Sequence, residues 1–149
     1  MKHFVAVLLI AWCLNGHAST CSMKSAKDIA EHAEVAFLGT VAKIEESSYK
    51  PRGLCWESSK DRSKCGGKLV TFNVSENLKG DYGSVVKVVS EDGCYCTGQY
   101  WAVSSSYLVV ARKNTSDSPG EFTAENVCGG TGPVEEREQE IEALRATSR

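Results

Sequence analysis

The sequence has little histidine, little net charge and no long apolar run. It contains 3 histidines in 149 residues and carries a formal net charge of −2 at pH 7. A small negative charge gives no electrostatic reason to bind nucleic acid or an anionic membrane surface, so we expect neither as a partner. The apolar run from Phe4 to Leu14 is shorter than the ~20 residues that a membrane-spanning helix needs.

This short apolar run fits an export signal. A basic start precedes it and small, polar residues follow it, which is typical of a secretory signal peptide. Gly16 and Ala18 form a small-x-small cleavage pattern, so we expect a signal peptide over residues 1–18 and a mature chain that begins at Ser19. A signal that extends to residue 20 would instead make Cys21 the first residue. The protein is therefore predicted to be secreted, either to the extracellular space or to the periplasm of a Gram-negative source.

The scarcity of histidine removes most catalytic chemistries. His32 is the only histidine of the predicted mature chain, and it lies on an expected helix without a Ser–His or Cys–His motif. The acidic residues Asp117, Glu121 and Glu125 show no recognisable catalytic pairing. We therefore predict a protein that is not an enzyme and needs no cofactor. Removing the signal leaves sixteen basic and nineteen acidic residues, a net charge of minus three.

The cysteine count predicts a disulfide framework. Of the seven cysteines, Cys13 leaves with the signal peptide, and an even number in an exported chain indicates three disulfides. Cys55 and Cys65 lie in a long loop over residues 47–67, and a bridge between them would close that loop locally. The spacing lacks the Cys-x2-Cys pairs of structural zinc sites, so no metal of the protein's own is expected. The remaining mature cysteines are Cys21, Cys94, Cys96 and Cys128.

The pattern of the mature chain predicts a mainly β fold with two short helices. Runs rich in β-branched and aromatic residues predict strands over residues 35–44, 69–76, 84–90, 106–112 and 121–127. Helices are expected over residues 26–33, after a capping-box-like Ser25, and over residues 134–145, after Pro133. We expect turns at 78–81 and 129–133, a bend at Gly39, and a compact five-stranded barrel with helices at its edge. The barrel domain would span residues 19–132, and a C-terminal amphipathic helix and tail would span 133–149.

Several features in order carry a resemblance to a known family. They are a leading Cys21, a helix followed by the strand Glu34–Gly39, the words Leu78-Lys79-Gly80, Cys94–Cys96 before the strand Tyr107–Val110, and a closing Val127-Cys128. Together they resemble the inhibitory domain of the tissue inhibitors of metalloproteinases (TIMPs), within the netrin-like group. The resemblance covers residues 21–128 and implies a five-stranded OB-fold barrel in a single-domain, TIMP-like protein.

The resemblance also implies a mechanism, in which the start of the mature chain acts as an inhibitory wedge. The amino group and carbonyl of Cys21 would chelate the catalytic zinc of a target metalloprotease, and Ser22 would enter the neighbouring pocket. Met23 and Lys24 would continue the wedge. The neighbouring ridge would consist of Glu91, Asp92 and Gly93. The function implied is a secreted metalloprotease inhibitor, expected to be a monomer.

Met23 stands where the family has its second cysteine. Because Cys94 and Cys96 are too close to pair well with each other, Cys21 is expected to bond one of them and Cys128 the other. The second of these cysteines would then replace the one missing at Met23.

Two questions stay open in the sequence. A non-inhibitory netrin-like module that binds a secreted or matrix protein is the alternative function. Asn73-Val74-Ser75 and Asn114-Thr115-Ser116 are N-glycosylation acceptors if the source is eukaryotic, and Asn114, in a polar loop, is the better of the two.

Overall fold

The computed structural model describes residues 22–47, 67–91, 98–115 and 120–148. The predicted signal peptide and most of the loop over residues 47–67 lie outside these ranges. So do several predicted site residues: Cys21, Cys55, Cys65, Asp92, Gly93, Cys94 and Cys96.

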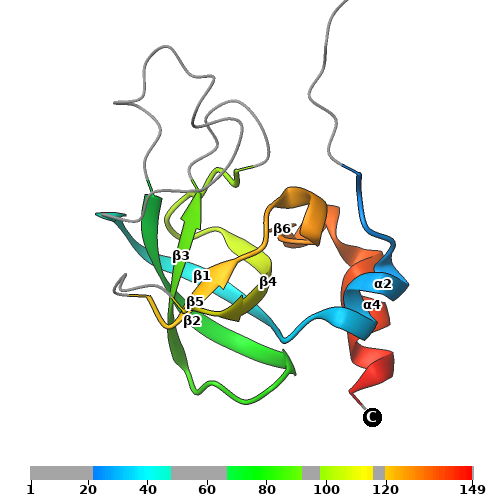
Figure 1. Cartoon of the computed structure of the whole chain (residues 1–149). Helices are drawn as coiled ribbons and strands as arrows, with labels where there is room; N and C mark the ends of the chain where they lie inside the picture. The colour runs from blue at the N-terminus through cyan, green and yellow to red at the C-terminus, as the bar shows by residue number, and fades with distance from the viewer. Residues whose placement is uncertain (1–21, 48–66, 92–97, 116–119, 149) are drawn as a thin grey trace, which may run out of the picture.

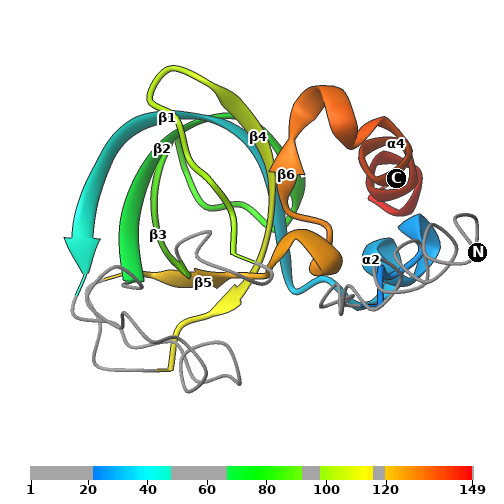
Figure 2. The ribbon, with the colours of Figure 1, turned by 90° about the horizontal axis from the view of Figure 1, so that it is seen from above.

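Five strands close into a barrel of OB-like topology (Figures 1 and 2). They are β1 (Val35–Ser47), β2 (Gly67–Lys79), β3 (Val85–Glu91), β4 (Ser106–Lys113) and β5 (Phe122–Ala124). Their order around the barrel is β1-β2-β3-β5-β4, and β4 pairs again with β1. All of these pairings are antiparallel except β3 with β5, which is parallel. The predicted five-stranded, mainly β barrel is confirmed.

Strand β1 makes closure possible because it serves two neighbours. It pairs with β2 from Ala36 to Ser47, and its first half, Val35–Thr40, also pairs with β4. One of its register shifts falls between Leu38 and Gly39, where the sequence predicts a bend. A Cβ at Gly39 would lie 3.2 Å from the Asn73 carbonyl oxygen, so this close approach favours glycine.

The inside of the barrel is filled by aromatic rings and valines. Phe72 is fully buried and lies at the centre of a ring cluster, with centroids 5.6 Å from Phe37 and 5.3 Å from Trp101. Trp101 contacts Tyr107 in turn, at 4.8 Å. All three contacts are edge-to-face, the arrangement that aromatic quadrupoles favour.

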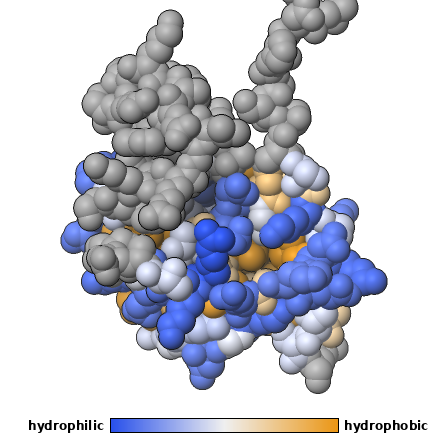
Figure 3. Space-filling view, in the orientation of Figure 1, coloured by the Kyte–Doolittle hydropathy of each residue, from blue (hydrophilic) through white to orange (hydrophobic). Residues whose placement is uncertain are grey.

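Two helices form a second core outside the barrel. Helices α2 (Ala26–His32) and α4 (Glu138–Thr147) lie side by side (Figure 2) and share a core with residues of β1, β2 and β4. Figure 3 shows polar side chains over most of this face and apolar atoms in the seam between barrel and helices. The seam explains why β1 and β4 are apolar on both faces. Its buried members are Ile29, Ala30, Ala36, Leu78, Leu108, Val110, Ile141 and Leu144.

Several predicted boundaries differ from the structure, which gives the physical reason for three of them. The predicted turn at 78–81 begins only at Gly80, because Leu78 is buried in the second core and Lys79 still pairs with β1. The fifth strand ends at Ala124 rather than at residue 127, since Asn126 caps the 3-10 helix η2 (Val127–Gly129).

The C-terminal helix likewise starts later than predicted. Pro133 leads into a 3-10 turn, η3 (Val134–Glu136), and α4 begins only at Glu138. Arg137, with φ −125° and ψ 26°, interrupts the helix because its side chain turns inward. The predicted turn at 129–133 contains the short strand β6 (Gly132–Pro133), which pairs with β4.

The β2–β3 turn offers a test of packing against backbone strain. Gly80 and Gly83 both have positive φ, +86° and +76°. A Cβ on Gly80 would meet the Tyr82 hydroxyl at 2.1 Å, whereas a Cβ on Gly83 meets nothing within 4 Å. We expect Gly83→Ala to lower the free energy of unfolding by about 1 kcal/mol and Gly80→Ala by about 2–4 kcal/mol, measured by urea unfolding. Equal losses would contradict the packing account.

An ion pair fixes the end of α4 to β2. The Arg145 guanidinium donates to both carboxylate oxygens of Glu76, at 3.0 and 2.6 Å. These hydrogen bonds, followed by the guanidinium charge, lower the pKa of the Glu76 carboxyl and raise that of Arg145.

The lowered pKa of Glu76 gives a pH dependence with a definite sign. The stability that this carboxylate supplies is present above the unfolded pKa of about 4.3 and is lost as the pH falls through the lower folded value. We expect Glu76→Gln to cost roughly 0.2–1 kcal/mol at pH 7, since both side chains are exposed, and to flatten the acid limb of the stability curve. Acid titration of unfolding checks this against Glu135→Gln, a change at an exposed glutamate of η3. An acid limb unchanged by Glu76→Gln would contradict it.

Candidate functional site

The predicted wedge residues that the structure describes form an exposed, extended segment. Ser22, Met23 and Lys24 are all exposed, and Met23 is 56% exposed although it is a large apolar residue. The segment leads directly into α2 (Figure 1). Its exposure means that these side chains are available to a partner.

The segment ends at a well-formed helix cap. The Ser25 hydroxyl oxygen accepts from the Asp28 backbone N–H at 3.1 Å and donates to the Asp28 carboxylate at 2.6 Å. This side-chain hydrogen bond lowers the pKa of Asp28, as do a backbone hydrogen bond from Ser25 and the nearby His32 and Lys27. The predicted capping box is therefore present, and it fixes where the extended segment stops.

A backbone hydrogen bond ties the segment to η2. The Lys24 N–H donates to the Cys128 carbonyl oxygen at 3.1 Å. Cys128 is buried and disulfide-bonded, and no other cysteine lies within the described ranges, so its predicted pairing stays a prediction. The Asn126 side-chain oxygen accepts from the N–H groups of Cys128 and Gly129 at 3.1 and 3.0 Å. Residues about a hundred positions apart are thus held together.

Arg137 holds η2 in place by hydrogen bonds to backbone carbonyl oxygens. Its guanidinium donates to the carbonyl oxygens of Val127 at 3.0 Å and Thr131 at 3.3 Å, and to the Glu140 carboxylate at 3.2 Å. The side chain is 7% exposed, and a Cβ on Gly132 would lie 2.5 Å from its Nε. Sequence reasoning missed this residue, because it stands in a charged run that predicts a solvated helix face.

Thr131 connects the same region to the barrel. Its hydroxyl donates to the Val110 carbonyl at 3.0 Å and accepts from the Val110 N–H at 3.1 Å, and the residue is fully buried. Lys24 is therefore hydrogen-bonded to η2, and the residues that follow η2 are hydrogen-bonded to strand β4. A partner of the exposed segment would meet a support held by both the barrel and α4.

The predicted ridge is described only at its first residue. Glu91 ends strand β3, and in Figure 1 this strand ends toward the same end of the molecule as the segment that precedes α2. Asp92 and Gly93 lie outside the described ranges, so their proximity to the wedge stays a prediction.

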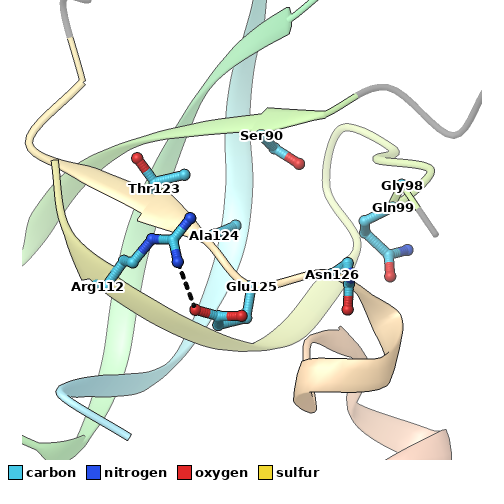
Figure 4. Close-up of a pocket in the computed structure, with 8 residues that line it drawn as sticks. All are labelled: Ser90, Gly98, Gln99, Arg112, Thr123, Ala124, Glu125 and Asn126. Atoms are coloured by element: carbon cyan, nitrogen blue, oxygen red, sulfur yellow. Dashed lines mark ion pairs between the residues drawn. The ribbon is translucent and has the colours of Figure 1, made fainter. Parts of the chain in front are cut away.

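A small polar cavity lies between β3, β5 and the segment before β4 (Figure 4). Its volume is about 80 Å³, and Arg112 and Glu125 form an ion pair at 3.6 Å in its wall. Pockets for small molecules are typically ~300–1,000 Å³, so this one has room for a few waters. Its lining residues are Ser90, Gly98, Gln99, Arg112, Thr123, Ala124, Glu125 and Asn126.

The predicted solvent-facing histidine is confirmed. His32 is exposed, and its Nδ1 lies 2.9 Å from the Asp28 carbonyl oxygen. Asp28, Glu31 and His32 have their ligand-type atoms within 4.8 Å of one another on α2. These groups already have local partners, since Ser25 bonds Asp28 and Lys27 pairs with Glu31 at 3.7 Å.

No protein-family model matches the chain, and no curated protein matches it. None of the described helices has the length and apolar character needed to cross a bilayer.

Proposed function

We propose that the protein is a secreted, TIMP-like inhibitor of zinc metalloproteases, which acts through a wedge formed by residues 21–24. The observation that carries this proposal is the hydrogen bond from Lys24 to Cys128, which holds an exposed segment against a buried, disulfide-bonded support. The barrel of OB-like topology supports it as well, because the resemblance implies that fold.

A fixed segment suits inhibition on physical grounds. Ordering a flexible segment on binding costs roughly 0.5–1.5 kcal/mol for each immobilised side chain. The Lys24 backbone is already hydrogen-bonded to Cys128, so the end of the segment that follows Ser22 and Met23 needs no further ordering when a partner binds.

The chemistry requires Cys21 to be the first residue. Only then is its nitrogen an amine with an electron pair to donate, rather than an amide whose pair is delocalised into the carbonyl. The amine and the Cys21 carbonyl would occupy the open position of the target's zinc and displace its reactive water. Ser22 would enter the pocket beside the metal, and residues 91–93 would support it from the ridge.

Disulfides complete the proposal. We assign Cys55 to Cys65, Cys21 to one of Cys94 and Cys96, and Cys128 to the other. Peptide mapping of the secreted protein tests this pairing directly. A free thiol at Cys21 would contradict the wedge, since nothing would then fasten its first residue.

A non-inhibitory binding module is the second candidate, and one observation favours it. The turn before β4 exposes Tyr100 by 71% and Val103 by 57%. This turn is held in place, because Tyr107 accepts from the Ala102 N–H at 3.0 Å and donates to the Tyr100 carbonyl at 3.2 Å. Aromatic side chains on a rigid support are typical of protein-binding surfaces.

Two measurements separate the candidates. N-terminal sequencing and intact mass of the secreted protein show whether the chain starts at Cys21 or at Ser19. Chains prepared with each start are then assayed against a panel of zinc endopeptidases. The proposal expects inhibition only from the chain that starts at Cys21. A secreted chain that starts at Ser19 and inhibits nothing would favour the binding module.

A further inference from the structure

The two glycosylation acceptors lie in very different surroundings. Asn73 is exposed on β2, between the buried Phe72 and the half-buried Val74, so it points outward. Its side chain makes no hydrogen bond to another residue of the described ranges. Asn114 is half-buried at the end of β4.

The amide of Asn114 is already in use. Its Nδ2 donates to the Gly120 carbonyl at 2.7 Å, and its Oδ1 accepts from the Thr123 hydroxyl at 3.4 Å. These bonds connect β4 to the start of β5. A sugar on Nδ2 would remove one of its two N–H groups and add bulk beside Gly120, a position so close to the neighbouring strand that even an added Cβ would lie 2.3 Å from the Val89 side chain.

From this contrast we infer that an N-linked glycan is carried by Asn73 and not by Asn114, reversing the preference that the sequence gives. The Asn73 amide nitrogen would attack the anomeric carbon of a lipid-pyrophosphate-linked oligosaccharide. A nitrogen–carbon bond forms, the carbon–oxygen bond to the pyrophosphate breaks, the amide loses a proton and the lipid pyrophosphate leaves. Transfer takes place before folding is complete, and only Asn73 then lets the barrel close around the modified chain.

The surface around Asn73 fits a glycan. Val85 pairs directly with Asn73 across β2 and β3 and is 53% exposed, while its neighbour Val86 is fully buried. Side chains opposite one another on the same face of two strands lie ~5 Å apart, so the first sugar would cover Val85. Strand β3 has 7 residues and ends at Glu91, which places this site about 20 Å along the strand from the predicted ridge. The glycan would therefore leave the wedge accessible.

The test is secretion of the full chain from insect or mammalian cells. Intact mass is measured before and after peptide N-glycosidase digestion in heavy-oxygen water, which labels each formerly modified asparagine as aspartate. We expect the label at Asn73 only. Asn73→Gln should lose the glycan mass, and Ser75→Ala, which removes the acceptor motif but keeps Asn73, should do the same. Asn114→Gln should keep the glycan mass and lower the thermal midpoint.

This inference rests on the proposed export and not on the wedge, so their failures are distinguishable. A secreted chain with label at Asn114, or with none at either site, overturns the glycan assignment alone. A secreted chain modified at Asn73 that inhibits no protease overturns the wedge alone. A chain retained in the cell without any glycan overturns both the export and this inference.

Discussion

One alanine placed before Cys21, in a chain that otherwise starts there, is expected to weaken inhibition of the target protease severely. The extra residue turns the Cys21 amine into an amide, which cannot donate an electron pair to zinc. Removing a central contact from an interface typically costs about 2–4 kcal/mol, on the order of a 30- to 1,000-fold rise in the inhibition constant. Titration of protease activity with inhibitor measures this rise.

A matched control separates chemistry from folding. The same alanine added after Arg149 changes the mass equally and leaves the start of the chain unaltered. Both variants should unfold at the wild-type temperature, because residues 22–24 are exposed and bury little apolar area. Full inhibition by the N-terminally extended chain would contradict chelation by the amine, whatever the rest of the interface does.

Replacing Arg137 with alanine is expected to cause the largest loss of stability among single changes to a charged residue in the described part of the protein. The substitution leaves the half-buried Glu140 carboxylate and the carbonyl oxygens of Val127 and Thr131 without their donor. Breaking a buried pair in this way costs about 3–5 kcal/mol. The loss is measured as a lower urea midpoint at an unchanged slope.

Arg112→Ala is the control, since it also removes an arginine from an ion pair. Arg112 is exposed, and its nitrogen lies 3.6 Å from Glu125, so about 1 kcal/mol or less is expected. Arg137→Ala should also speed hydrogen exchange at the Lys24 amide, because that amide depends on η2. Similar costs for the two arginines, with no change in exchange, would show that Arg137 supports neither η2 nor the wedge.

The strands of the barrel were predictable because each carries its own local pattern. In β2, Val70 and Phe72 point inward while Asn73 points outward, and this alternation can be read without knowing any partner strand. The helices that the sequence predicts at the edge of the barrel are α2 and α4, and they pack with apolar residues of β1 and β4. Strand ends were less accurate, because Leu78 is buried in a core built from distant residues and Asn126 caps the 3-10 helix that follows it.

The parallel pairing of β3 with β5 leaves no trace in the local pattern. It joins Val88 to Phe122 and Val89 to Thr123, over two residue pairs only. The burial of Arg137 could not be predicted for a related reason. A basic residue among glutamates is typical of a solvated helix face. Two of its partners are backbone carbonyl oxygens, which every sequence supplies.

The residues of the candidate site could be predicted, but the hydrogen bond that holds them against the rest of the protein could not. The resemblance singled out Ser22, Met23 and Lys24, and their exposure agrees with a role in binding. The hydrogen bond from Lys24 to Cys128 involves backbone atoms alone, so no pattern of side chains in the sequence predicts it. The glycan acceptors show the same limit, since the polar surroundings of Asn114 concealed a nitrogen that already bonds Gly120.

The contact between α2 and α4 dictates when the protein can finish folding during synthesis. Ile29 and Ala30 leave the ribosome more than a hundred residues before their partners Ile141 and Leu144. Contacts between such distant parts of a chain form slowly, and uncovered apolar surface invites aggregation in the meantime. In a nascent chain halted before α4, the second core would therefore lack Ile141 and Leu144, and its other apolar residues would stay exposed. A holding chaperone would bind that exposed apolar surface.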